Sequence, residues 1–113
     1  MLNQVTLVGR LVKKPEVVES ENKTKRSVIT LAVPRNFKNV NGEYETDFID
    51  CILWQNNALN TAEYCDKGDI IGIRGRIQTS VYEKEGTKIY KKEIIAEKVT
   101  FLSGNKKEKA EEA

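Results

Sequence analysis

The chain has 113 residues, of which 39% are hydrophobic and 32% are charged, and its net charge is only +2. These values predict one soluble globular domain, and the overall charge gives no sign of a nucleic-acid partner. The sequence contains no histidine, so it lacks the commonest metal ligand and the commonest general base. No glycine-rich phosphate loop precedes a helix, and no carboxylates have metal spacing. We therefore expect a protein that is not an enzyme and binds no metal and no cofactor.

Three features predict where the protein works. Residues 1–4 lack the basic start and the long apolar run of a signal peptide. No segment approaches the ~20 apolar residues that a membrane span needs. The two cysteines, Cys51 and Cys65, do not form a C-x-x-C pair, and we interpret them as buried thiols in a reducing compartment. We expect a cytoplasmic protein.

The first half of the chain predicts three strands. Residues 5–12 alternate and are rich in β-branched side chains. A polar loop leads to a second strand at residues 27–33, and Pro34 is expected to end the regular ladder because proline donates no hydrogen bond to it. Asn41-Gly42 then predicts a tight turn before a third strand at residues 46–55.

Residues 57–67 are the one segment that predicts a helix. Asn56 or Asn57 is the expected N-cap, and Gly68 is expected to end the helix. The side chains expected to face the core are Ala58, Leu59, Ala62 and Cys65.

Two further strands complete the domain. They cover residues 69–81 and 89–101, with a turn at Glu85-Gly86 between them. We expect a domain of residues 1–103, followed by a short flexible polar tail at residues 104–113.

Five strands with one helix between the third and the fourth predict an all-β OB-fold, a five-stranded Greek-key barrel. Because each strand gives one face to the interior, alternate residues are expected in the core: Ile49, Cys51, Leu53, Ile71, Ile73 and Ile77. The same alternation places the other residues of these strands outward, among them Phe48, Asp50, Ile52, Trp54, Arg74, Arg76 and Tyr82.

Aromatic rings mixed with cations on an outer barrel surface indicate single-strand binding, because bases stack on rings and phosphates attract cations. Around the outward arginines, further cations flank Phe37 and crowd the last hairpin: Arg35, Lys38, Lys84, Lys88, Lys91 and Lys92. Two simpler interpretations remain open. The rings of Phe48, Trp54 and Tyr82 can pack on a partner subunit or on the helix, and the cations can be a solvated face. Tyr44 fits a hairpin residue better than a stacking platform.

Several separated segments resemble the bacterial single-stranded DNA-binding proteins, in the same order and with similar gaps. They are MLNQVTLVGRLVKKPEV, ITLAV, TDFIDCILW, KGDIIGIRGRIQTSVYE and IIAEKVTFL. The resemblance covers residues 1–102 and implies an OB-fold that assembles as a homotetramer, a dimer of dimers, with single-stranded DNA wrapped over its surface.

The resemblance also implies roles for individual residues. The rings that stack on bases fall on Phe37, Phe48, Trp54 and Tyr82, and the expected phosphate contacts are Arg10, Arg35, Lys38, Arg74, Arg76, Lys84 and Lys88. By analogy, the first strand pairs with that of a neighbouring subunit, with Asn3, Val5, Leu7 and Gly9 at the interface.

The sequence departs from the family pattern in the DNA track and at the C-terminus. No basic residue follows Trp54, and Asp50 is an acid near the expected path of the DNA. The chain reads to Ala113 without the acidic tip that recruits partner proteins in the main replicative members. We therefore expect no recruitment of replication or repair proteins through such a tip. The pattern fits a short form, of the competence-associated or element-encoded type.

The leading hypothesis is sequence-independent binding and protection of single-stranded DNA in replication, recombination, repair or DNA uptake, in association with the nucleoid. The alternative is a primosome-type OB module that acts mainly through protein contacts. A third hypothesis is RNA binding.

Overall fold

The computed structural model describes residues 1–102, so the predicted tail at residues 104–113 lies outside the described residues. Within them the elements are, in chain order, β1 (Val5–Leu11), β2 (Val18–Glu19), β3 (Lys25–Lys38), β4 (Tyr44–Trp54), α1 (Asn56–Tyr64), β5 (Ile70–Lys84) and β6 (Thr87–Phe101). The two-residue β2 lies in the segment that the sequence predicts as a loop.

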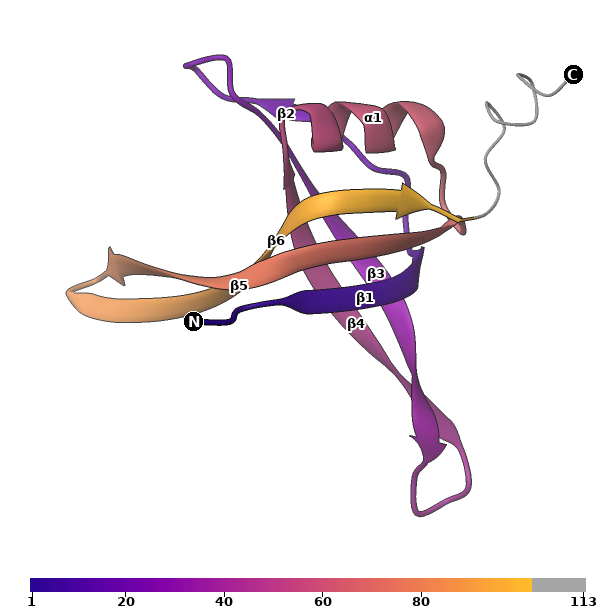
Figure 1. The fold of residues 1–113 in the computed structure, drawn as a ribbon. Helices are drawn as coiled ribbons and strands as arrows, with labels where there is room; N and C mark the ends of the chain where they lie inside the picture. The colour runs from indigo at the N-terminus through magenta and orange to yellow at the C-terminus, as the bar shows by residue number, and fades with distance from the viewer. Residues whose placement is uncertain (103–113) are drawn as a thin grey trace, which may run out of the picture.

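The strands form one sheet that closes on itself (Figure 1). The strand order is β1-β5-β6-β4-β3-β2, and an additional pairing of β1 with β3 joins the two ends of the sheet into a barrel. The short β2 pairs only with the start of β3. The five long strands and the helix between β4 and β5 thus confirm the predicted OB-fold.

The barrel interior is filled by aliphatic side chains and both cysteines. The buried hydrophobic residues include Leu11, Ile29, Leu31, Cys51, Leu53, Ala58, Cys65, Ile71, Ile73 and Ala96. Burial raises the pKa of the Cys51 and Cys65 thiols to about 11. Neutral buried thiols at these two positions agree with the interpretation made from the sequence.

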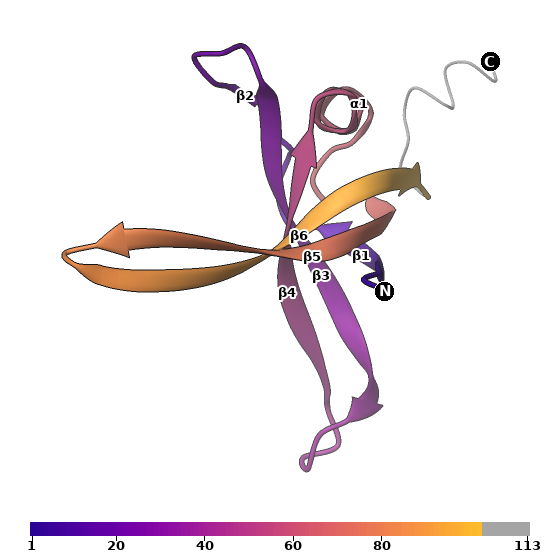
Figure 2. The same ribbon diagram turned by 60° about the vertical axis from the view of Figure 1, so that its left-hand side comes forward.

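Two long hairpins extend beyond the barrel, β3–β4 and β5–β6, and they point in different directions (Figures 1 and 2). The predicted end of this strand at residue 33 is wrong, because β3 runs on to Lys38. The regular ladder nevertheless ends at Pro34, as predicted. Pro34 pairs with Thr46 where a register shift begins, and irregular positions of a ladder tolerate proline. The core prediction for Ile77 is also wrong. Its side chain is 45% exposed because β5 has left the barrel at that point.

The helix is shorter than predicted and has a different first turn. It ends at Tyr64, and its N-cap is Gln55, at φ 52°, with no side-chain capping hydrogen bond. The Asn57 amide instead donates to the carbonyls of Ala96 and Glu97, both at 3.4 Å. The core prediction for Leu59 is wrong, since this residue is exposed while Thr61 is buried.

Candidate nucleic-acid interface

The outer face of the β3–β4 sheet is built from paired residues that alternate with the core. Four pairs lie on it: Arg26 with Trp54, Val28 with Ile52, Thr30 with Asp50, and Ala32 with Phe48. Residues directly opposite each other in a ladder project to the same side. We call these eight residues the outer face. It exposes Phe48 by 67% and Trp54 by 39%, so both predicted rings are accessible.

One member of the outer face is not accessible as predicted. Ile52 is buried, because β6 runs beside β4 and pairs Ile52 with Ile95, which is buried too. Ile52 thus lies on the side of β4 that alternation predicts, but it is not accessible there. The two isoleucines form an apolar base where the β5–β6 hairpin leaves the barrel.

Cations lie over two of the rings on the β3–β4 hairpin. The Arg26 guanidinium is 5.8 Å from the centre of the Trp54 ring, and the Lys38 ammonium is 5.7 Å from that of Tyr44. Tyr44 is 60% exposed. It shares the side of β4 that carries Phe48, because the two are separated by an even number of residues. The structure thus places Tyr44 on the same side of β4 as Phe48, and the hairpin role favoured by the sequence stays a prediction.

The β5–β6 hairpin carries two exposed tyrosines on opposite sides. Tyr82 pairs with Ile89, and the neighbouring Tyr90 pairs with Val81, so the two rings point away from each other. Tyr82 was predicted to contact DNA. Tyr90 is not among the predicted rings, although it is the more exposed of the two and the basic pair Lys91-Lys92 follows it directly.

The predicted basic residues fall into two groups. Among residues 1–102, the side chains of Arg74, Lys84 and Lys88 make no hydrogen bond or ion pair. Arg10 donates to the Gly68 carbonyl at 2.6 Å, and Arg76 donates to Gln78 at 2.6 Å. The first group can meet a phosphate without breaking a contact.

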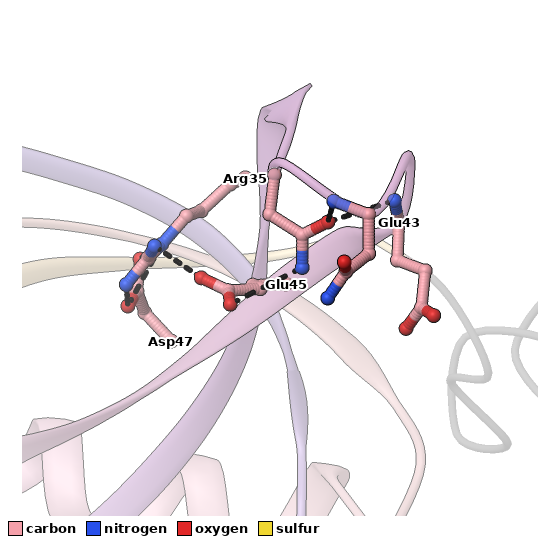
Figure 3. Close-up of polar contacts among 6 residues, drawn as sticks. Arg35, Glu43, Glu45 and Asp47 are labelled. Atoms are coloured by element: carbon pink, nitrogen blue, oxygen red, sulfur yellow. Dashed lines mark hydrogen bonds and ion pairs between the residues drawn. The ribbon is translucent and has the colours of Figure 1, made fainter.

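Arg35 is the most strongly engaged of the predicted cations (Figure 3). Its guanidinium donates to both carboxylate oxygens of Asp47, at 2.9 and 3.1 Å, and also to Glu45. The hydrogen bond from Arg35 lowers the pKa of Asp47 below its usual value. A phosphate would have to compete with two carboxylates for Arg35, whose DNA contact stays a prediction.

The residues predicted at the subunit interface have contacts within this chain. The Asn3 amide donates to the Ile77 carbonyl at 2.7 Å and accepts from the Ile77 N–H at 2.9 Å. Leu7 packs against the core. Gly9 is enclosed, since a Cβ there would meet the Ala32 carbonyl oxygen at 2.9 Å.

The edge of β1 nevertheless leaves room for a second copy. β1 pairs with β5 from Val5 to Arg10, but with β3 only at Arg10 and Leu11. Within the described chain, the second edge of residues 5–9 is therefore unpaired. Such an edge can accept another strand, so the predicted pairing between subunits is geometrically open.

Comparisons with known proteins identify relatives over nearly the whole chain. The model of the single-strand binding protein family matches residues 2–102. Single-stranded DNA-binding protein B of Bacillus subtilis (strain 168) is 47% identical over 111 residues, which are 97% of this chain and 98% of that protein. Single-stranded DNA-binding protein 1 of Lactococcus lactis is 46% identical over 94% of this chain and 71% of that protein.

A longer relative is matched over part of its length. Single-stranded DNA-binding protein A of Bacillus subtilis (strain 168) is 46% identical over 90% of this chain, but the match spans only 60% of that protein. The described residues contain no helix long and apolar enough to cross a membrane.

Proposed function

Because the chain belongs to the single-strand binding protein family, we propose that it binds single-stranded DNA of any sequence on the outer face and the adjoining hairpins. Bases stack on the exposed rings of Phe37, Phe48, Trp54 and Tyr82. Membership in a family of binding proteins agrees with the prediction that the chain is not an enzyme. The observation that carries the proposal is that all four predicted rings are exposed, between 39% for Trp54 and 67% for Phe48.

The physical basis is a platform of rings with cations beside it. Base–aromatic stacking contributes roughly 1–3 kcal/mol per base and tolerates every base, because each base has a π-face. The side chains of Arg74, Lys84 and Lys88 make no hydrogen bond or ion pair among residues 1–102 and can neutralise phosphates. Counterions released from the DNA make such binding weaken as salt rises.

The same rings argue against the alternative of a module that acts mainly through protein contacts. A base can stack on the exposed rings without any rearrangement of the barrel. Because the rings are spread over two hairpins, they suit an extended DNA strand better than a compact protein surface. We place the function in DNA replication, recombination, repair or uptake, in the cytoplasm at the nucleoid.

The proposed assembly is a homotetramer, a dimer of dimers. Its support is the family membership together with the unpaired edge of β1 at residues 5–9. Pairing of this edge with a second copy would satisfy its backbone groups and remove a site of unspecific association.

Titration with oligo-dT tests DNA binding directly. Trp54 is the sole tryptophan, so quenching of its fluorescence reports a base stacked at the outer face. We expect saturable quenching that weakens as salt is added. A Trp54→Phe variant, followed by gel retardation, keeps a ring without the fluorophore and should still bind. Absence of both quenching and retardation at low salt would refute the proposal.

Light scattering with and without oligo-dT tests the assembly. A mass of four chains, retained when DNA is bound, is expected, and a monomer would refute the tetramer. Competition between oligo-dT and oligo-U of equal length separates DNA from RNA binding. Tighter binding of oligo-U would favour an RNA-binding role.

A further inference from the structure

Asp50 is a carboxylate in the middle of the outer face, between the rings of Phe48 and Trp54. A negative charge is unexpected there, because it would repel the phosphates of a DNA strand that passes over these rings. The Thr30 hydroxyl donates to its Oδ1 at 2.6 Å. Among residues 1–102 this is its one hydrogen-bond donor, and no cation lies within ion-pair distance of it. The Oδ2 atom therefore remains an acceptor without a protein donor.

Asp50 lines a surface hollow of about 160 Å³ between the outer face and β6. Val28 and Ile52 contribute apolar surface to it, while Lys91, Lys92 and Glu93 line it from β6. The volume equals that of about five water molecules in the liquid, which is the size class of one pyrimidine ring. An apolar surface with charged groups beside it suits a flat ring that carries polar atoms on its edge.

The charged side chains around the hollow, all of them within residues 1–102, form no ion pairs with one another. Glu93 accepts from the Ser80 hydroxyl at 3.1 Å, and Arg26 lies over the Trp54 ring. Among the described residues, neither lysine of the hollow makes an ion pair. The cations are thus available to phosphates, and the carboxylate of Asp50 is available to a donor on a base.

We propose that Asp50 accepts a hydrogen bond from the exocyclic amino group of a base seated at this hollow, so that cytosine is preferred there over uracil or thymine. Cytosine presents its N4 amino group where thymine and uracil present the O4 acceptor. A carboxylate is an acceptor only, so it attracts the first and repels the second. The inference rests on the proposed function and adds a local base preference to binding that otherwise tolerates any sequence.

Comparison of oligo-dC with oligo-dU of equal length tests the preference. Oligo-dU is used in place of oligo-dT because the thymine methyl group would add an apolar contact that has nothing to do with the O4 acceptor. The measured quantity is the ratio of the two affinities, from Trp54 fluorescence, in the full chain. Asp50→Ala should shift this ratio toward oligo-dU by about threefold to tenfold, the effect of one hydrogen bond of ordinary net strength. Asp50→Asn should also shift it toward oligo-dU, because the amide can donate to O4 as well as accept from N4 and so no longer discriminates between the two bases.

Glu43→Gln is the matched control for the lost charge. Glu43 lies on the same hairpin with its side chain turned away from Arg35 (Figure 3), and its neutralisation should change both affinities by the same factor. Circular dichroism melting verifies that each variant folds. The Asp50 variants are expected to fold because Asp50 is exposed.

Three results are distinguishable. A ratio that shifts in both Asp50 variants and not in Glu43→Gln supports the inference. Variants that bind both oligonucleotides more tightly at an unchanged ratio overturn it, because Asp50 then only repels phosphates. Failure of the wild-type chain to bind either oligonucleotide overturns the proposed function, and this inference with it.

Discussion

Phe48 offers the sharpest test of the outer face, because its ring is exposed and contributes little to the fold. The side chain is 67% exposed, so about a third of the ~200 Å² that a Phe ring can bury is covered by the chain itself. At ~25 cal/mol per Å² this cover stabilises the fold by at most ~1.6 kcal/mol. Phe48→Ala should therefore leave a folded protein with a slightly lower melting temperature.

The loss on DNA should be larger. Removal of one stacking ring costs roughly 1–3 kcal/mol of binding free energy, which raises the dissociation constant for oligo-dT about 5-fold to 150-fold. Fluorescence titration of Trp54 measures this change at fixed salt. Leu59→Ala is the matched control, since it truncates an exposed apolar side chain on α1 and should leave the affinity unchanged.

Two outcomes would refute the reasoning. If folded Phe48→Ala binds oligo-dT as tightly as the wild type, the ring is not a stacking platform. If the variant unfolds, the ring belongs to a packed interface, and the alternation of β4 was interpreted with the wrong side outward.

Three further predictions concern the barrel and its charges. Leu53→Ala removes a fully buried side chain and should lower the free energy of unfolding by roughly 2–5 kcal/mol in urea titration; a loss below ~0.5 kcal/mol would contradict the core assignment. Gly75→Ala places a Cβ 2.1 Å from a carbonyl oxygen of β6 and should cost roughly 1–3 kcal/mol, whereas Gly72→Ala meets nothing closer than 3.6 Å and should melt nearly as the wild type. Because Arg35 lowers the pKa of Asp47, this pair stabilises the fold above the unfolded pKa of about 3.9, and the stabilisation is lost as the pH falls through the lower folded pKa. Arg35→Gln should reduce the acid-induced decline in melting temperature, and an unchanged decline would show that the pair is not what the acid breaks.

The alternation of residues along single strands was sufficient to divide much of the barrel correctly. In β4 it placed Cys51 and Leu53 in the core and left Phe48 and Trp54 accessible. The five long strands and the position of the helix also followed from local patterns and turn residues, so the OB-fold was predictable. These features depend on the chemistry of neighbouring residues, which the sequence displays directly.

The candidate site was predictable only in part. The structure agrees that the four predicted rings are accessible. It also shows that Tyr44 and Tyr90 are exposed, which depends on how far the two hairpins extend. It also shows that Arg35 is held by Asp47, twelve residues away in the chain. Which cations are free is a property of cross-strand contacts, and periodicity within one strand carries no information about them.

The sequence by itself therefore determined the family, the strand alternation and the types of side chain available for binding. Only the tertiary structure decided that Ile52 is buried where β6 pairs with β4, that Ile77 lies beyond the barrel, and that β3 continues past Pro34. It also gave Asp50 a partner, the Thr30 hydroxyl directly across the ladder. The physical reason is that alternation tells which side of its own strand a residue faces, whereas burial and pairing depend on which other strand passes that side.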